Sequence, residues 1–226
     1  MKKSTLNSFL FITGIVPLIA VLLCLHLLPD EIPAHYDMNM NIDRWGSKYE
    51  TLILPVFTLI ETVFLYIAAK RCGRRENGES TKKVTLITGI TSNLLFAAIT
   101  AVMLAGAFDS VNINEVTQGF SMNIIFVITG IAVAVSGNYL PKCKLNSCIG
   151  LRTEWSMANE DVWFKCQRFG GVLLVVCGIV MAVFSAAVEN SAAVIAGNLF
   201  IMIFMTAASV AGSKIIYDKM YGGQNH

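Results

Sequence analysis

Three separate parts of the chain hold residues whose types and spacing could do chemistry. The first is an acidic segment, residues 29–50, in which five acids stand against two bases, a local charge of minus three. Such a surface attracts a cationic peptide or ion. A single histidine at flexible spacing from the acids is a poor metal ligand set, so we predict no metal site. We predict instead that this segment binds a ligand through His35, Asp37, Asn39, Asp43, Trp45 and Lys48.

Two features of the same segment bear on its structure. Pro29, Pro33 and Gly46 predict an ordered turn rather than a helix. Trp45 is open to a second interpretation, because tryptophan commonly anchors a chain at the headgroup interface of a membrane.

The second part is one acid, Glu61, in the middle of an apolar run. A carboxylate inside a membrane costs several kcal/mol unless it is paired, hydrated or protonated. It could carry a proton or bind a ligand. Alternatively, it is a neutral acid that joins two helices through a hydrogen bond, with Asn93 at similar depth as the partner.

The third part is a polar connection, residues 141–169, with the residues just before it. Arg152 in this connection could hold a phosphate or carboxylate. Alternatively, its side chain could be buried and brace the loop by capping the carbonyl groups of a helix. The connection has no histidine, and neither Ser147 nor Ser156 has an evident base, so we predict no enzymatic activity and no cofactor. The residues that we assign to signalling or to loop bracing are Asn138, Pro141, Lys144, Asn146, Gly150, Arg152, Thr153, Trp155 and Trp163.

The composition determines which elements must position these residues. Of the 226 residues, 55% are hydrophobic and only 14% are charged, and the mean hydropathy is +0.63. Soluble proteins carry about 25% charged residues. A helix needs about 20 apolar residues to cross a bilayer. We therefore predict an all-α, polytopic membrane helical bundle with six transmembrane helices, at 9–28, 52–69, 84–108, 122–140, 170–188 and 192–211.

The basic residues predict the orientation. All but two of the 17 Lys and Arg residues fall on one side of a six-span chain, and the exceptions are Arg44 and Lys48. The positive-inside rule then places both termini in the cytoplasm. A net charge of +2 gives no reason to expect direct binding of nucleic acid. We divide the chain into an amino-terminal module, residues 1–80, and a second domain, residues 81–226.

One further element is expected before the fifth span. Ser156 or Asn159 can cap a helix whose first turn holds Glu160 and Asp161. Its apolar positions lie on one stripe, so we predict a short helix at the membrane interface, ending near Phe169.

Three strings, in two regions of the chain, resemble a known family. The string from 137 to 156, Gly-Asn-Tyr-Leu-Pro-Lys-x-Lys-x-Asn-x-x-Ile-Gly-Leu-Arg-Thr-x-Trp-Ser, resembles the signature of SdpI-like proteins. The strings Leu-Pro-x-x-Ile-Pro-x-His at 28–35 and Asp-x-Trp-Gly-Ser-Lys at 43–48 resemble the amino-terminal module often found beside it. This family consists of polytopic bacterial membrane proteins that protect cells from a secreted, membrane-active peptide, the sporulation-delaying toxin. Its founding type also holds a winged-helix autorepressor at the membrane when toxin is present.

The resemblance implies an immunity and receptor protein of the bacterial cell membrane. Its expected partners are membrane lipids, a secreted peptide toxin and a cytoplasmic winged-helix repressor. The acidic segment and Glu61 would bind the toxin. Two other functions stay open: a membrane enzyme acting on lipid or peptide at the cytoplasmic headgroup plane, and a small transporter. The chain has no Gly-rich phosphate-binding loop for ATP, which counts against an ATP-driven transporter.

Overall fold

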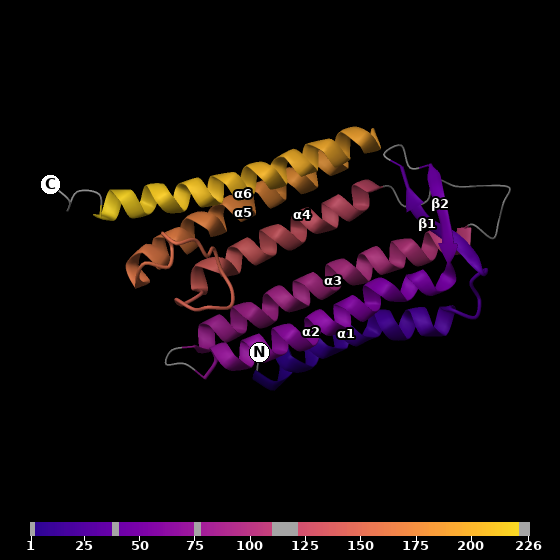
Figure 1. Ribbon diagram of the computed structural model, residues 1–226, viewed down its shortest axis with the longest axis horizontal. Helices are drawn as coiled ribbons and strands as arrows, with labels where there is room; N and C mark the ends of the chain where they lie inside the picture. Colours follow the sequence, from indigo (N-terminus) through magenta and orange to yellow (C-terminus); the bar gives the residue numbers. More distant parts are fainter. Residues whose placement is uncertain (1–2, 38–40, 75–77, 110–121, 222–226) are drawn as a thin grey trace.

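The computed structural model describes residues 3–37, 41–74, 78–109 and 122–221, and its main elements are long helices (Figure 1). Six of them contain an apolar stretch long enough to cross a membrane, which confirms the predicted helical bundle. A two-stranded antiparallel sheet lies at one end of the helices (Figure 1). The helices are α1 (Lys3–Cys24), α2 (Ile53–Cys72), α3 (Glu79–Asp109), α4 (Met122–Tyr139), α5 (Glu160–Ala187) and α6 (Ser191–Tyr221). The strands are β1 (Glu31–Tyr36) and β2 (Ile42–Ser47), and short 3₁₀ helices cover Lys48–Leu52 and Leu140–Lys142.

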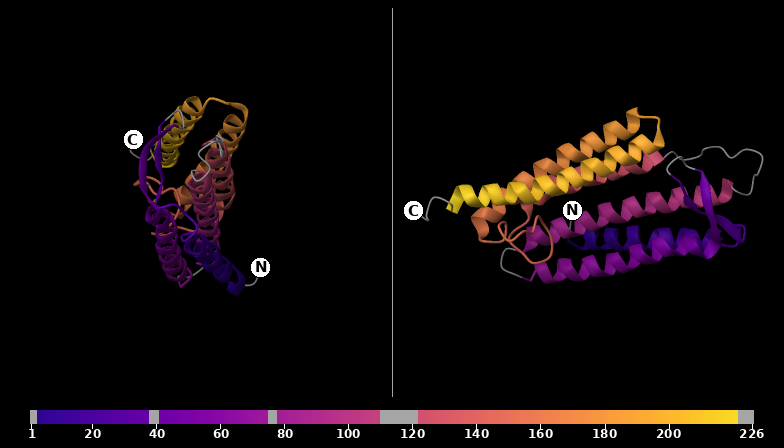
Figure 2. Two further views of the ribbon diagram at one scale, coloured as in Figure 1. Left: turned by 90° about the vertical axis from the view of Figure 1, so that its right-hand side faces the viewer. Right: turned by 45° about the horizontal axis from the view of Figure 1, so that its top comes forward.

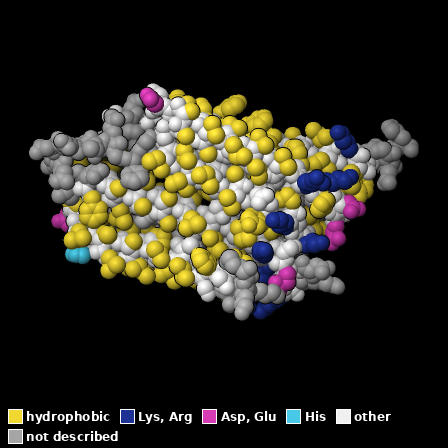
Figure 3. All heavy atoms as spheres, turned by 180° about the vertical axis from the view of Figure 1, so that it is seen from behind, with side chains coloured by type: hydrophobic (Ala, Val, Ile, Leu, Met, Phe, Trp, Pro, Cys, Tyr) yellow, Lys and Arg dark blue, Asp and Glu magenta, His cyan; other side chains and the backbone are white. Residues whose placement is uncertain are grey.

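The helices form two groups of three that run side by side (Figures 1 and 2). Helices α1, α2 and α3 pack on one another, α5 packs on α4 and α6, and the groups meet where α3 contacts α4. The hairpin of β1 and β2 lies at one end of the bundle, and the connection from α4 to α5 lies at the other. Lys and Arg side chains gather at the end with the α4–α5 connection, beside a broad apolar surface (Figure 3). This charge distribution suits the predicted orientation, which stays a prediction.

The acidic segment forms a β-hairpin, where we had predicted only an ordered turn. Ile32 pairs with Gly46 and Pro33 with Trp45 across the two strands. Ile32 is buried against Leu28 and Ala107, so the hairpin is fixed to the ends of α1 and α3. Because side chains alternate along a strand, burying Ile32 turns its neighbours outward.

Our prediction of a separate short helix before the fifth span was wrong. Residues 160–169 are the first turns of α5, which runs without a break to Ala187. Asn159 caps this helix, and its side-chain oxygen accepts hydrogen bonds from the backbone N–H of Asp161 at 3.1 Å and of Val162 at 3.0 Å. Trp163 is buried beneath the α4–α5 connection rather than lying at an interface, and Cys166 is buried beside Ser213 of α6.

Helices α4 and α5 approach each other very closely. A Cβ atom on Gly178 would lie 2.5 Å from the carbonyl oxygen of Gly130, and one on Gly130 would lie 2.5 Å from that of Gly178. Gly137 and Gly171 repeat this arrangement nearer the basic end of the bundle. Small residues allow such contact between membrane helices, whose association is driven by close packing.

Candidate functional site

His35 and Asp43 meet on the hairpin. The Nδ1 atom of His35 lies 2.6 Å from a carboxylate oxygen of Asp43, and both side chains are largely exposed. Asp37 accepts hydrogen bonds from the backbone N–H of Asn41 at 2.8 Å and from its side-chain amide at 2.9 Å. Asn39 lies outside the described residues. His35 and Asp43 thus lie together on the hairpin, and Asp37 contacts Asn41; that these residues bind a ligand stays a prediction.

Two ion pairs fix the base of the hairpin. Arg44 donates to both carboxylate oxygens of Glu50, at 3.1 and 2.9 Å, and Lys48 contacts Asp30 at 2.8 Å. The hydrogen bond and the charge of Lys48 lower the pKa of Asp30. Glu50 raises the pKa of Arg44 in the same way. Lys48 thus has a structural partner, which we had not predicted.

Trp45 projects from β2 and is 51% exposed, so it is available for contact with lipid or a ligand. Within the ranges that the structure describes, no three His, Cys, Asp or Glu side chains come together as a metal site. The hairpin therefore offers an acidic, aromatic surface on a rigid support.

Glu61 of α2 is hydrogen-bonded to Ser92 of α3, rather than to Asn93, which the helix-joining alternative had considered as its partner. Its Oε1 atom accepts a hydrogen bond of 2.8 Å from the Ser92 hydroxyl. Its Oε2 atom is shielded from solvent and has no partner among the described residues. Eight residues separate Glu61 from the start of α2, a rise of about 12 Å. It therefore lies well below the hairpin, inside the apolar part of the bundle.

Asn93 has a different role. Its side-chain amide donates to the carbonyl oxygen of Leu10 at 3.0 Å and to the hydroxyls of Thr13 and Thr62 at 3.2 and 2.9 Å. It joins α1, α2 and α3 at a fully buried position.

In the α4–α5 connection, Asn146 is a bracing residue. Its amide nitrogen donates to the carbonyls of Lys144 and Ile149, and its oxygen accepts from the backbone N–H of Cys148 and Ile149. Four hydrogen bonds of 2.7–3.0 Å use all the capacity of one buried amide.

The rest of the connection is held by Gln167 of α5, which the sequence did not single out, and by Ser156 within the loop. The side chain of Gln167 accepts from the backbone N–H of Leu151 at 2.8 Å and donates to its carbonyl at 2.9 Å. The Ser156 hydroxyl donates to the carbonyl of Leu151 and accepts from the N–H of Thr153. This hydroxyl is therefore committed to the loop, which weakens the enzyme interpretation. The available signal was the placement of Gln167 one turn after Trp163, on the same helix face.

Trp163 and Thr153 also hold the connection in place. The Trp163 indole N–H donates to the carbonyl of Cys143 at 2.9 Å, and its ring packs against Val84. The Thr153 hydroxyl pairs with that of Ser213 on α6 at 2.8 Å. Burial raises the pKa of the Cys143 thiol to about 12, which disfavours the reactive thiolate form.

The remaining predicted residues of this region lie at its surface. Arg152 is exposed and, within the described part of the chain, makes no hydrogen bond or ion pair, so the buried, helix-capping alternative was wrong. Trp155 is half-buried beneath the Lys214 ammonium, 5.8 Å from its ring centre. The backbone N–H of Lys144 bonds to Thr81, and Pro141 packs close to Gly171. Asn138 is exposed at the end of α4.

Gly150 is required by its backbone and by its neighbours. Its φ is 122°, and an added Cβ would lie 2.8 Å from the Trp163 ring and 2.9 Å from the Gln167 side-chain oxygen. We predict that Gly150→Ala lowers the free energy of unfolding by about 1–3 kcal/mol, because such a conformation is strained for any residue with a Cβ. The measurement is the thermal unfolding midpoint in detergent. Gly73→Ala, at a helix end with negative φ, is the control, and an equal loss there would contradict the prediction.

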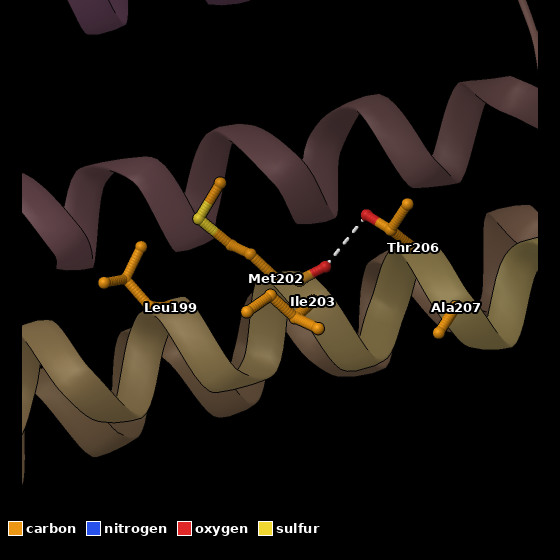
Figure 4. A pocket seen from close by; sticks show the side chains of 5 residues that line it. All are labelled: Leu199, Met202, Ile203, Thr206 and Ala207. Carbon is orange, nitrogen blue, oxygen red and sulfur yellow. Dashed lines mark hydrogen bonds between the residues drawn. The ribbon is translucent and has the colours of Figure 1, made fainter.

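A shallow furrow with a volume of about 470 Å³ runs along α6 (Figure 4). Its walls are Leu199, Met202, Ile203, Thr206 and Ala207. The one hydroxyl among them, on Thr206, donates to the carbonyl of Met202 at 2.9 Å. The furrow therefore presents an apolar surface suited to lipid and has no acid or base for catalysis.

Known protein families match the chain at the α4–α5 connection and at the hairpin. The model of the SdpI/YfhL protein family matches residues 142–218, which include the braced connection, α5 and most of α6. A domain of unknown function (DUF1648) matches residues 12–59, which include the hairpin. The Immunity protein SdpI of Bacillus subtilis (strain 168) is 27% identical over 192 residues, covering 82% of each chain. No solved structure matches the chain. The chain is therefore similar to the SdpI/YfhL protein family over residues 142–218, and to Immunity protein SdpI of Bacillus subtilis over most of its length.

Proposed function

We propose that this protein is a membrane immunity protein that protects a bacterial cell from a secreted, membrane-active peptide toxin. The observation that carries the proposal is the similarity to Immunity protein SdpI across 82% of both chains. A match of this length must include parts of both groups of helices. The six apolar helices support a membrane location. No catalytic role is part of this proposal.

The toxin-binding surface in this proposal is the outer face of the hairpin. Asp43 and Trp45 are exposed there, and they offer negative charge and an aromatic ring to a cationic, amphipathic peptide. The support is rigid, because Ile32 is buried and Arg44 is held by Glu50. A preorganised surface loses little entropy when it binds. Glu61 is too deep to join this surface directly, so in this proposal it contacts only a toxin segment inserted in the membrane.

The braced connection at the opposite end is the surface proposed for a cytoplasmic partner. Arg152 is an exposed charged residue of its signature and stands on a loop held rigid by Asn146 and Gln167. Sequestering a winged-helix repressor would require that toxin binding favour a second conformation of the bundle. Arg152→Ala is expected to remove repressor binding and leave protection unchanged.

The test is survival of a toxin-sensitive bacterium that expresses this protein and is exposed to the sporulation-delaying peptide toxin. The unaltered protein is expected to protect. A double variant, Asp43→Asn with Trp45→Ala, should protect about 10-fold less at equal membrane levels, because central aromatic and charged contacts carry most of a binding energy.

Tyr49→Ala is the matched control, because Tyr49 is 61% exposed beside the hairpin but lies outside the cluster. It should protect as well as the unaltered protein. Failure of the unaltered protein to protect would refute the immunity proposal. Full protection by the double variant would refute only the location of the toxin site.

A further inference from the structure

A second groove lies between α4 and α5 near the basic end of the bundle. Its volume is about 180 Å³, and its floor is the close contact of Gly137 and Gly171. The absence of side chains at this contact leaves a depression beside the helices. Val172 and Val176, which are 60% and 52% exposed, form one wall of the depression, with Val175. Asn138 and Pro141 form the other wall.

The groove changes character along its length. The α5 wall at Val172 and Val176 is apolar. One turn back from Val172, on the same face of α5, stands Arg168, and a further turn away stands Lys165. Four residues on a helix rise about 6 Å, so Arg168 lies at the level where the apolar surface gives way to charge. On the α4 side, Asn138 is exposed and makes no hydrogen bond within the described ranges.

The charges around this end are mostly positive. Lys142 directly follows Pro141, and its ammonium stands over the Tyr139 ring, 4.4 Å from the ring centre. Asp161 lies one turn beyond Lys165 and is the acid on this face of α5. Two lysines and one arginine against one aspartate leave a net charge of plus two around this end of the bundle, near the groove.

We propose that this groove binds one anionic phospholipid. An acyl chain lies along Val172 and Val176, and the phosphate lies among Arg168, Lys142 and the Asn138 amide. Arginine and a neutral amide donate to phosphate oxygens, and positive charge selects an anionic headgroup over a zwitterionic one. The inference is independent of the toxin, because the groove lies at the end of the bundle opposite the hairpin.

A lipid explains this combination better than another helix does. A helix from a second copy would cover the apolar wall but would leave Arg168 and Asn138 without an anion. A phospholipid supplies the apolar chain and the negative charge at the same spacing along the membrane normal. Its glycerol region would occupy the groove beside the contact of Gly137 and Gly171.

The experiment is native mass spectrometry of the purified full-length protein in detergent. The probes are phosphatidylglycerol and phosphatidylcholine with identical acyl chains. The unaltered protein is expected to retain one phosphatidylglycerol with an apparent affinity about 10-fold above that for phosphatidylcholine. The double variant Lys142→Gln with Arg168→Gln should remove that preference.

Two controls separate this site from general attraction to the basic end. Lys70→Gln with Lys83→Gln removes two exposed charges at the same end of the bundle but on α2 and α3, and the preference should remain. Val172→Trp fills the groove and should abolish retention, whereas Val183→Trp, at a 63% exposed position on α5, should not. Each variant is first checked for a single symmetric peak in size-exclusion chromatography.

Three results would overturn the proposal. Equal retention of both lipids would show that no headgroup is recognised. Equal loss in the Lys70 and Lys83 control would show diffuse attraction. A dimer that carries no lipid and separates in the Val172→Trp variant would assign the groove to a second copy of the chain.

Discussion

Trp163→Ala is expected to lower the free energy of unfolding by about 3–5 kcal/mol, the range for truncating a large aromatic side chain in a core. Trp163 is 2% exposed and is among the largest fully buried side chains that the structure describes. It fills the space between Val84 of α3 and the α4–α5 connection, and its indole donates to the carbonyl of Cys143. Its loss would leave a cavity and an unpaired buried carbonyl, and it would disconnect the two groups of helices at the basic end.

Two further variants separate these contributions. Trp163→Phe keeps most of the packing and loses the hydrogen bond, so it should cost about 1–3 kcal/mol. Trp155→Ala removes a half-buried ring whose described contact is with Lys214, and it should cost less than about 1 kcal/mol. The measurement is the thermal unfolding midpoint in detergent, followed by loss of helical circular dichroism. A Trp155→Ala loss as large as that of Trp163→Ala would contradict this account.

The six spans could be predicted from sequence because membrane insertion depends on local composition. Each needs about 20 apolar residues, and the chain has six such runs. The ends were less accurate. Helix α6 continues to Tyr221, where we had ended it at 211, and α3 begins at Glu79 instead of 84. A helix that leaves the membrane keeps its backbone hydrogen bonds among charged residues, so hydropathy does not mark where it stops.

The partner of Glu61 shows why details of the site were beyond sequence reasoning. Ser92 and Asn93 are adjacent and lie at nearly the same depth, but successive residues on a helix point about 100° apart. Ser92 faces Glu61, and Asn93 faces α1 as well as Thr62. Depth could be estimated from the sequence, whereas the rotation of α3 depends on how three helices pack together.

The hairpin could not be predicted from the sequence, because it depends on contacts between residues that are far apart in the chain. Its burial rests on Ile32 against Ala107, which is 75 residues further on. The segment also contains proline and glycine, which favour turns over strands. Sequence reasoning identified His35, Asp43 and Trp45 by their chemistry but could not derive the pairing of the strands. In the α4–α5 connection, the signature residues were identified, while Gln167 was missed because its role depends on the loop folding back onto α5.

Gly178→Ala is expected to lower the free energy of unfolding by about 3 kcal/mol, the upper part of the range for overpacking. The added Cβ would lie 2.5 Å from the Gly130 carbonyl oxygen and 2.6 Å from the Ala134 nitrogen. Both obstacles are backbone atoms of α4, so no side chain can turn away. The two helices must separate, and the contacts of Gly137 with Gly171 along the same seam are weakened too. The measurement is again the unfolding midpoint in detergent, after purification at equal yield.

Gly212→Ala is the matched control for this prediction. Gly212 lies on α6, and the nearest atoms to an added Cβ all belong to the Phe169 ring. That ring is 37% exposed and can rotate outward, so the cost should stay below about 1 kcal/mol. The two substitutions add the same methyl group between two packed helices, and they differ in whether backbone or a movable side chain stands in the way. Equal destabilisation by both would mean that the close approach of α4 and α5 does not decide the stability of this half of the bundle.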